Sequence, residues 1–478
     1  MSAAMGLSQS TMSAEAAETP GPRVFADPSS PTGYTARFVY YNPTATSVRF
    51  VADILLRNWA DPSDPTVYQP QQYKPGLMRG GGAYNVQMTN AGDGYWVTEV
   101  PLAAGANQYW FYVNNDTSLW VADPANSPRF APDGLTGTAR RAFNMVNVPY
   151  DPVKQNYAPL AARTIENPRP DIKHGSWSYV PLQIGTATRT IGVYLPPDYR
   201  AQRGKPYKTI YMQHGGGQDQ SDWMTMGDVP TIMDNLLADR ATEEAVVITT
   251  NTNYLGAANQ GYPNLRNVVI PFVESNYNVS TRAIDRAFAG LSAGSAVTQN
   301  LINFDATKFG YWGPWSGGAS VRATTPDVDK PYILYGGGRW DFGLPNANTV
   351  TALDATAFVE NEVVAGAHDF NAWNQLFTIF ARDYLWQPHA FMADKIAALD
   401  TAVGATGLDR REKRDLSTQL RKVDQALSRD KSEQTVALLQ GFVDEVDALH
   451  DGRQLTDAQA AALMAGAQKM ISSLSFWL

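Results

Sequence analysis

The sequence predicts an α/β protein whose doubly wound, mostly parallel sheet is preceded by an all-β sandwich and followed by a small all-α helical module. Short alternating apolar runs separated by Gly, Pro, Asn and Asp fill residues 23–148. Strand and helix patterns alternate over residues 174–392, and only helical patterns follow in 393–478. At 478 residues the chain also exceeds the roughly 250–300 residues at which single cores stop growing.

The first of these regions follows a lead-in, residues 1–22, that we expect to be disordered because it lacks apolar runs. Runs such as 36–41 and 47–51 alternate as half-buried strands do, which predicts a β-sandwich over residues 23–148. Its successive segments resemble the early-set immunoglobulin-like domains that precede catalytic domains in glycan-active enzymes; these segments are residues 94–102, 107–113 and 123–126. The resemblance leaves glycan binding and bracing of the enzyme open as roles.

The middle region begins after a Pro- and Asn-rich stretch, residues 149–173, that is expected to be a linker. Helical patterns at 229–237 and 265–276 alternate with strand patterns at 188–195, 208–213, 245–250, 286–289 and 331–335. Strand and helix in repetition indicate a mostly parallel sheet covered on both faces.

The last region, residues 393–478, has no proline and carries apolar residues at helical spacing. The two main stripes are Leu416, Leu420, Val423 and Leu427, and Val436, Leu439, Val443 and Val446. Thr456 and Gln459 have the spacing of a capping box, which predicts the start of a final helix. The segments LSTQLRKVDQAL, ALLQGFVDEVDAL and LTDAQAAALMAGAQKMISSL resemble the FIMAH-type module of secreted Gram-positive enzymes, which implies a secreted, extracellular protein.

Composition excludes several classes of function. A net charge of −8 without any basic run argues against nucleic acid or membrane partners, and no apolar run reaches bilayer length. The absence of cysteine excludes disulfides, thiol nucleophiles and thiolate metal sites. No two of the five histidines have metal-ligand spacing, so neither a metal nor another cofactor is expected.

One pentapeptide indicates the catalytic nucleophile. Gly290-Leu291-Ser292-Ala293-Gly294 matches G-x-S-x-G, in which the glycines allow a sharp strand-to-helix turn that exposes the serine. A β-rich segment, residues 287–289, precedes the motif, and small helix-compatible residues follow it. Ser292 is therefore the predicted nucleophile, and it needs an imidazole to accept its proton.

The predicted base is His368. His174 lies in the linker and His450 in the helical module. The G-x-S-x-G motif is typical of α/β-hydrolases, whose catalytic residues follow the chain order serine, acid, histidine. His214 precedes Ser292 and therefore does not fit that order. His368 sits where a Gly-rich loop enters a helix, as a base above the sheet should, whereas His389 follows a proline and is interpreted as a surface or packing residue.

The predicted acid is Asp341, which follows the buried strand pattern 331–335 on a glycine-rich loop. Asp327 and Asp329 precede that strand and would lie at its opposite end. The tetrahedral intermediate also needs two N–H donors. We expect Ala293 to supply one and Gly216 the other, although the neighbouring glycines, 215 and 217, remain alternatives. His214 then becomes a structural loop residue.

These motifs together resemble a known group of α/β-hydrolases. The segments YMQHGGGQDQSDW, VIPFVESNYNV, RAFAGLSAGSA, YILYGGGRWDF and GAHDFNAW are similar to the feruloyl and acetyl-xylan esterases of carbohydrate esterase family one and to the enterochelin esterases. The family triad falls on Ser292, Asp341 and His368, the residues reached above from order and position. The resemblance implies a serine esterase that uses no cofactor.

Aromatic residues near the motifs indicate the substrate. Trp223, Trp315 and Trp340 are predicted to bind a flat acyl group, with core packing as the alternative for each. The expected function is secreted hydrolysis of feruloyl or aryl esters of plant polysaccharide, with aromatic polyesters as promiscuous substrates. An enterochelin-type siderophore esterase and a catalytically inactive glycan-binding protein are the two alternatives.

Overall fold

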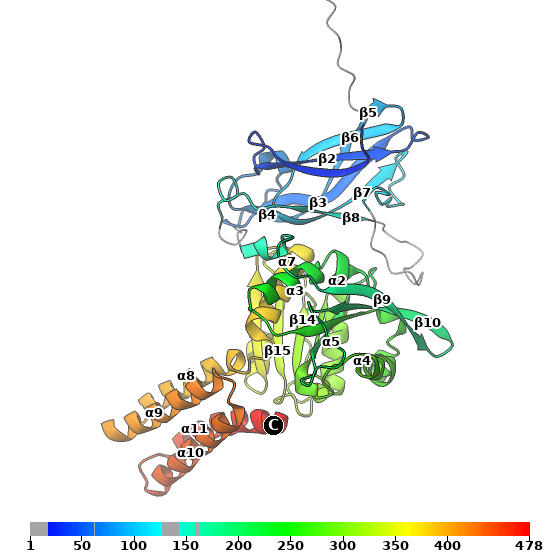
Figure 1. Ribbon diagram of the computed structural model, residues 1–478. Coiled ribbons are helices and arrows are strands. Elements are labelled where there is room, and N and C mark those ends of the chain that lie inside the picture. Colours follow the sequence, from blue (N-terminus) through cyan, green and yellow to red (C-terminus); the bar gives the residue numbers. More distant parts are fainter. Residues whose placement is uncertain (1–17, 62, 127–142, 158–161) are drawn as a thin grey trace, which may run out of the picture.

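A computed structural model describes residues 18–61, 63–126, 143–157 and 162–478. Figure 1 shows a β-sandwich, an α/β region and a helical bundle in that order along the molecule. Most of the predicted lead-in, residues 1–17, lies outside the described residues. Gly21 and Pro22, which the sequence placed in that lead-in, instead form the start of the first strand, where Gly21 pairs with Val39.

Two four-stranded antiparallel sheets form the sandwich. One consists of β1 (Gly21–Ala26), β2 (Tyr34–Tyr41), β6 (Tyr95–Pro101) and β5 (Thr89–Gly92). The other consists of β4 (Leu77–Gln87), β3 (Val48–Asn58), β7 (Gly105–Val113) and β8 (Asn144–Val148). Phe38 of the first sheet meets Phe50 of the second with ring centroids 4.2 Å apart. The all-β prediction is confirmed, and the immunoglobulin-like topology stays a prediction.

The α/β region is built on one eight-stranded sheet in the order β16-β15-β14-β13-β11-β12-β10-β9. The antiparallel strands at one side are β9 (Ser176–Ile184) and β10 (Ala187–Leu195). The parallel strands are β11 (Lys208–Gln213), β12 (Ala245–Thr250), β13 (Arg286–Leu291), β14 (Tyr311–Trp315), β15 (Tyr332–Gly338) and β16 (Phe358–Val364). This is the sheet of an α/β-hydrolase, as predicted.

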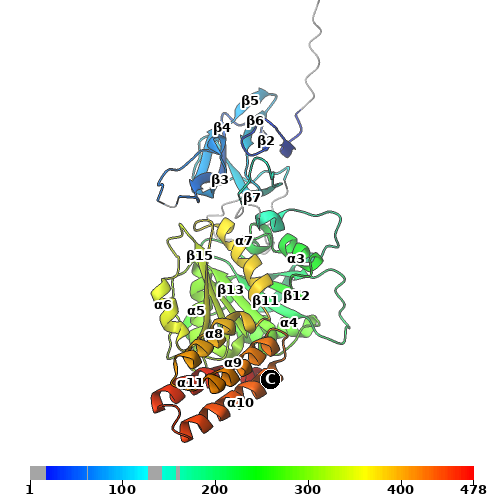
Figure 2. The same ribbon diagram turned by 90° about the vertical axis from the view of Figure 1, so that its left-hand side faces the viewer.

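Helices cover both faces of this sheet (Figure 2). Their apolar residues enter two clusters, one with α2 (Asp222–Thr225), α3 (Val229–Ala238) and α7 (Phe370–Ile379), the other with α4 (Ile270–Asn276), α5 (Ala293–Phe304) and α6 (Ala347–Asp354). All six residues of β12 are buried because its side chains alternate between these clusters, Val247 on one face and Val246 and Ile248 on the other. Because both faces of β12 are buried, its sequence is a run of mostly β-branched residues without polar alternation.

Short helical turns connect the main elements. The predicted helix over 265–276 starts as a π-turn, η5, before α4 continues it. The short turns are η1 (Pro70–Gln72), η2 (Ala162–Glu166), η3 (Thr252–Tyr254), η4 (Ala258–Gln260), η5 (Leu265–Val269), η6 (Ala283–Asp285), η7 (Ala306–Lys308) and η8 (Phe380–Tyr384).

The bundle consists of α8 (His389–Ala405), α9 (Arg410–Leu427), α10 (Ser432–Asp451) and α11 (Asp457–Trp477). The predicted stripes are buried apart from Val436, which is partly buried. The capping box of Thr456 and Gln459 is present at the start of α11. Bundle leucines such as Leu416 belong to the same apolar cluster as Trp315 of the central sheet, so one core runs through both parts.

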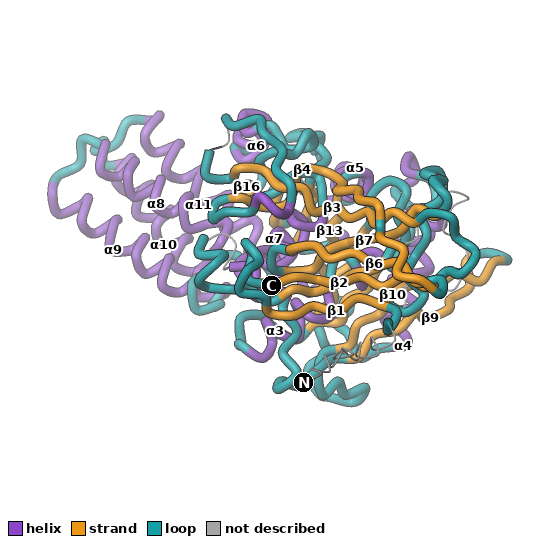
Figure 3. The backbone as a smooth tube through the Cα atoms, turned by 90° about the horizontal axis from the view of Figure 1, so that it is seen from above, coloured by secondary structure: helices purple, strands orange, loops and turns teal. Residues whose placement is uncertain are grey.

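Seen from above, the sandwich strands lie over the α/β region while α8 to α11 project to one side (Figure 3). Apolar residues of β3 and β4, Leu56 and Leu77, pack with Ala365, which follows β16. The sandwich therefore sits at the carboxyl ends of the central strands. Among the residues described above, none of the helices is both long enough and apolar enough to cross a bilayer.

Candidate active site

Ser292 stands on a sharp turn between β13 and α5. Its backbone adopts φ 53° and ψ −116°, which a non-glycine residue adopts only at a cost in free energy. The flanking glycines are required by space: a Cβ on Gly290 would lie 2.4 Å from the carbonyl oxygen of Gly294, and one on Gly294 would lie 2.5 Å from that of His214. The Ser292 N–H donates to the carbonyl of Trp315 at 2.9 Å, which ties the turn to β14.

The structure brings Ser292, His368 and Asp341 together. His368 Nε2 lies 2.8 Å from Ser292 Oγ, and His368 Nδ1 lies 2.8 Å from Asp341 Oδ1. The histidine side chain is 19% exposed and the aspartate side chain is fully buried. An imidazole placed in this way can take a proton from the hydroxyl with one nitrogen while the carboxylate fixes its tautomer through the other.

Asp341 is held as a charged carboxylate. Burial raises its pKa, but hydrogen bonds from His368, Ser316 and the N–H of Gly343 outweigh burial and keep the pKa below its ordinary value. The Gly343 N–H is 2.6 Å from Asp341 Oδ1. Ser316 Oγ accepts a hydrogen bond from Trp373 Nε1 at 2.8 Å, which leaves its own hydrogen for the carboxylate. A charged acid is what an imidazolium partner requires.

The loops that carry Asp341 and His368, the predicted acid and base, are tied to each other. The N–H groups of Arg339 and Trp340 donate to the carbonyls of Val364 and Gly366, each at 3.0 Å. A Cβ on Gly338 would lie 2.5 Å from Gly366, so only glycine allows this approach. These contacts fix the loop of Asp341 against the loop of His368.

On the base side, the next helix fixes the position of His368. Asp369 caps α7 by accepting hydrogen bonds from the N–H groups of Asn371 at 2.9 Å and Ala372 at 3.4 Å. The helix therefore begins immediately after His368. The imidazole also packs against the ring of Trp373 in a T-shaped contact, with ring centroids 5.1 Å apart.

The two predicted oxyanion donors lie next to each other. Ala293 is the first residue of α5, where backbone N–H groups have no partner within the helix. A Cβ on Gly216 would lie 3.9 Å from the Cβ of Ala293. The Gly215 N–H is taken by Gln218 Oε1 at 2.7 Å, whereas no hydrogen bond between described residues takes up the N–H of Gly216. This difference favours Gly216 over Gly215, and the assignment stays a prediction.

The other four histidines contact partners other than Ser292 Oγ. His214 is buried, its Nδ1 lies 2.7 Å from the carbonyl of Gly215, and its Nε2 accepts from the N–H of Thr252 at 3.2 Å. Burial lowers the pKa of His214, which keeps the imidazole neutral, as a structural loop residue should be. His389 instead pairs with Asp424 of α9 at 2.8 Å.

Two of the three predicted substrate-binding tryptophans are in the core, and that prediction is wrong for them. Trp223 is 1% exposed and Trp315 is 0% exposed, so neither ring has a surface that a substrate could touch. Trp223 Nε1 donates to the carbonyl of Gln213 at 3.0 Å, and the two rings meet edge-on 5.9 Å apart. Trp340 is partly buried and packs edge-on against Trp59 of the sandwich, 5.3 Å away. Its role with substrate stays a prediction.

Sequence reasoning missed Phe342, the residue next to the acid. Its ring stacks on the His368 imidazole with centroids 4.0 Å apart and planes 29° apart. The side chain is 87% exposed, the highest value among the large hydrophobic side chains described as exposed. No periodicity marks a residue in the middle of a turn, so adjacency to Asp341 was the one available signal.

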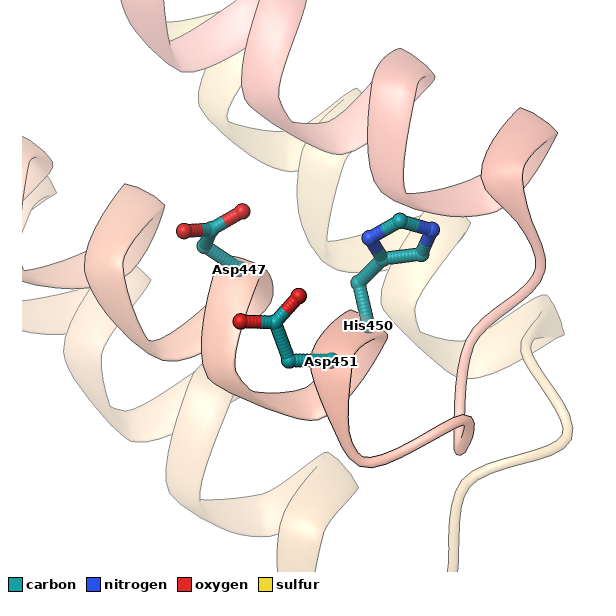
Figure 4. Close-up of side chains that lie close together, drawn as sticks. All are labelled: Asp447, His450 and Asp451. Atoms are coloured by element: carbon teal, nitrogen blue, oxygen red, sulfur yellow. The ribbon is translucent and has the colours of Figure 1, made fainter.

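One group of described residues could offer converging metal ligands, and it lies in the bundle. Asp447, His450 and Asp451 occupy the last turn of α10 with their ligand atoms within 4.8 Å of one another (Figure 4). His450 Nε2 is already paired with Asp457 at 3.0 Å, a hydrogen bond that raises the pKa of His450. This exposed group is on a different part of the chain from Ser292, and the prediction that no metal takes part in the chemistry stays a prediction.

Residues 393–472 match the FIMAH domain family. The chain carries a FIMAH domain. That match confirms the resemblance expected for the helical module, within the range 393–478 predicted for it.

Two curated proteins are similar to the α/β region. An endo-1,4-beta-xylanase/feruloyl esterase of Xylanibacter ruminicola is 31% identical over 224 residues, which cover 43% of this chain and 31% of the relative. Endo-1,4-beta-xylanase Y of Acetivibrio thermocellus is 29% identical over 143 residues, 27% of this chain and 13% of that protein. The chain thus spans about a third or less of the length of these relatives. The predicted resemblance to feruloyl esterases is confirmed.

Solved structures are similar at lower identity. A feruloyl esterase module from Clostridium thermocellum, complexed with sinapinate, has 21% identity and a TM-score of 0.39, covering 45% of this chain and 88% of that one. The enterobactin esterase of Shigella flexneri has 14% identity and a TM-score of 0.45, covering 77% of this chain and 97% of that one.

Proposed function

We propose that this protein is a serine esterase that hydrolyses carboxylic esters through an acyl-enzyme. The observation that carries the proposal is the hydrogen-bonded line from Ser292 Oγ through His368 to Asp341, with both distances at 2.8 Å. These are hydrogen-bond lengths at which a proton can pass between the hydroxyl and the imidazole.

In the first half of the reaction, His368 Nε2 takes the proton of Ser292 as Oγ attacks the ester carbonyl. Asp341 holds the Nδ1 proton and stabilises the imidazolium that forms. The negative charge that develops on the carbonyl oxygen is bound by the N–H groups of Ala293 and Gly216. The start of α5 adds its positive dipole end at the same point. His368 then protonates the alcohol oxygen, and the C–O bond breaks.

In the second half, water replaces the alcohol. His368 Nε2 removes a proton from water as its oxygen attacks the acyl carbon, and the second tetrahedral intermediate uses the same two N–H groups. Collapse returns the proton to Ser292 Oγ and releases the carboxylic acid. Every proton moves between Ser292, His368, water and the alcohol, so no cofactor is required.

The proposed substrates are feruloyl or aryl esters of plant polysaccharide, with aromatic polyesters as promiscuous substrates. The support is the 31% identity over 224 residues to a protein named as both xylanase and feruloyl esterase. Polymeric substrates of this kind are met outside the cell, and residues 393–472 match the FIMAH domain family, which the resemblance of the helical segments to modules of secreted enzymes supports as an export-related feature. We therefore propose an extracellular enzyme.

Wild type and Ser292→Ala, assayed with methyl ferulate and p-nitrophenyl acetate, test the proposal. We expect kcat of the variant to fall by at least about 10⁴-fold, because oxyanion binding alone remains. Ser275→Ala is the matched control, since Ser275 is exposed on α4 and its hydroxyl donates to the carbonyl of Pro271 at 2.7 Å. That variant should retain full activity. If the folded wild type were as inert as Ser292→Ala, the chain would instead be an inactive binding protein.

A further inference from the structure

Phe342 presents an aromatic face to solvent beside the reacting atoms. It is 87% exposed, although its ring stacks on His368 at 4.0 Å. A single exposed hydrophobic residue is common on protein surfaces. What distinguishes Phe342 is its contact, because the imidazole it covers must accept and return every proton of the proposed reaction.

The turn around Phe342 is fixed on both sides. The Asp341 carboxylate is hydrogen-bonded to His368 and to the Gly343 N–H. Its backbone carbonyl accepts a hydrogen bond from the N–H of Leu344 at 3.2 Å. A Cβ on Gly343 would lie 2.2 Å from the Ser316 carbonyl oxygen, so this turn packs closely against the segment after β14. Phe342 is therefore a positioned aromatic ring on a rigid turn.

Proton transfer places the alcohol side of the ester near this ring. His368 Nε2 must come within hydrogen-bond distance of the alcohol oxygen in order to protonate it. In the proposed reaction the carbonyl oxygen points instead to the N–H groups of Ala293, at the start of α5, and of Gly216, in the loop after β11. The alcohol group therefore leaves along the imidazole, and Phe342 covers one face of that imidazole.

We propose that Phe342 is the binding platform for the alcohol group of the substrate, and that this alcohol is a sugar ring. The inference rests on the proposed esterase function. Sugar rings carry apolar C–H faces that stack on aromatic rings, while their hydroxyl groups stay in water. A platform that is 87% exposed suits an alcohol that belongs to a long polysaccharide, because the chain can continue past it into solvent. A buried pocket would accept only a small alcohol.

The test varies the alcohol and the acyl group separately. Methyl ferulate and a feruloylated arabinoxylan oligosaccharide share the acyl group, whereas methyl ferulate and methyl acetate share the alcohol. For Phe342→Ala we expect the ratio of kcat/KM on the oligosaccharide to kcat/KM on methyl ferulate to fall about three- to tenfold, mainly through KM. Phe342→Tyr should keep the wild-type ratio, and Phe342→Leu, which fills the space without a ring, should lower it.

Phe304→Ala is the matched control. Phe304 is also an exposed phenylalanine, at 49%, but it lies at the far end of α5 from Ser292, about 18 Å away at 1.5 Å per residue. This variant should leave both kcat/KM values unchanged.

Two results would overturn the platform. Equal losses of kcat on both ferulate esters would mean that Phe342 only positions His368. A loss on methyl ferulate that exceeds the loss on methyl acetate, with the oligosaccharide ratio unchanged, would place the ring on the acyl side. A wild type inactive on all three esters would refute the esterase itself, which is a different result from either.

Discussion

The sandwich and the helical bundle meet the same central sheet at opposite ends of its strands. The sandwich contacts residues that follow β15 and β16: Trp59 packs against Trp340, and the Arg339 guanidinium lies 4.7 Å from the Trp59 ring. A Cβ on Gly80 would lie 3.3 Å from the Cβ of Ala367, the residue before His368. The sandwich thus touches both loops that hold Asp341 and His368.

The bundle instead contacts residues that precede the same two strands. Ser473 Oγ and Trp477 Nε1 donate to the carbonyl of Lys330 at 2.7 and 2.8 Å. Lys469 Nζ donates to the carbonyls of Asp354 at 2.9 Å and Ala357 at 2.8 Å. In a parallel sheet the reacting groups gather at the carboxyl ends of the strands. We therefore expect sandwich contacts to affect turnover and bundle contacts to affect stability alone.

The largest expected effect on kcat comes from comparing two aspartates that each contact a histidine, one in the α/β region and one in the bundle. Asp341 and Asp424 each lie 2.8 Å from a histidine nitrogen, His368 and His389 respectively. Asp341→Asn should lower kcat on methyl ferulate on the order of 10⁴-fold, because the imidazole loses its tautomer and charge partner. Asp424→Asn should leave kcat unchanged, and equal activity of both variants would remove Asp341 from the triad.

Two tryptophans, one in each flanking part, give the next effect. Trp59→Ala removes the contact with Trp340 and Arg339, and we expect kcat to fall about tenfold as the two loops lose their support. Trp477→Ala removes the bond to Lys330 and should lower Tm without changing kcat. The measurement is kcat on methyl ferulate together with Tm for each variant. A normal kcat in Trp59→Ala would mean that the sandwich does not brace the site.

The smallest effect concerns stability near the bundle. Burial, with Asp354, Asp394 and Glu362 nearby and Lys395 opposing them, raises the pKa of Glu360 to about 7. Because the folded state holds this proton up to a higher pH than the unfolded state does, stability is lost as pH rises from about 4.5 to about 7.

Glu360→Gln should therefore increase the free energy of unfolding at pH 8 by on the order of 1 kcal/mol, which raises Tm. At pH 4 it should have no effect. Thermal unfolding of both proteins at the two pH values measures this. An equal gain at both pH values would show that burial of charge is not the cause.

The sequence allowed the hydrogen-bonded arrangement of Ser292, His368 and Asp341 to be predicted, because chain order and topology limit where each residue can lie. Asp341 had to follow β15 and His368 had to follow the acid, so few residues qualified. The tryptophans were different, since an aromatic residue near a motif can point to either side of the sheet. Trp223 and Trp315 point into the core, and no spacing rule distinguishes that from a cleft.

The placement of the flanking parts could not be predicted either. Apolar stripes in α9 and α10 indicate that these helices pack, but not against what. Trp59 and Trp477 are single residues in a loop and at a helix end, and their partners are more than a hundred residues away along the chain. Such contacts depend on the shapes of two assembled surfaces, which local patterns do not encode.

The shared core has a consequence for how this protein can be divided. Trp315 and Tyr332 of the sheet, Phe391 of α8 and Leu416 of α9 belong to one buried cluster. A chain cut at residue 392 would leave the apolar surface beneath α8 facing water, which favours aggregation. The FIMAH domain is thus not a detachable appendage of the α/β region, and replacing it would require redesign of the apolar contacts that Phe391 and Leu416 make within the shared cluster.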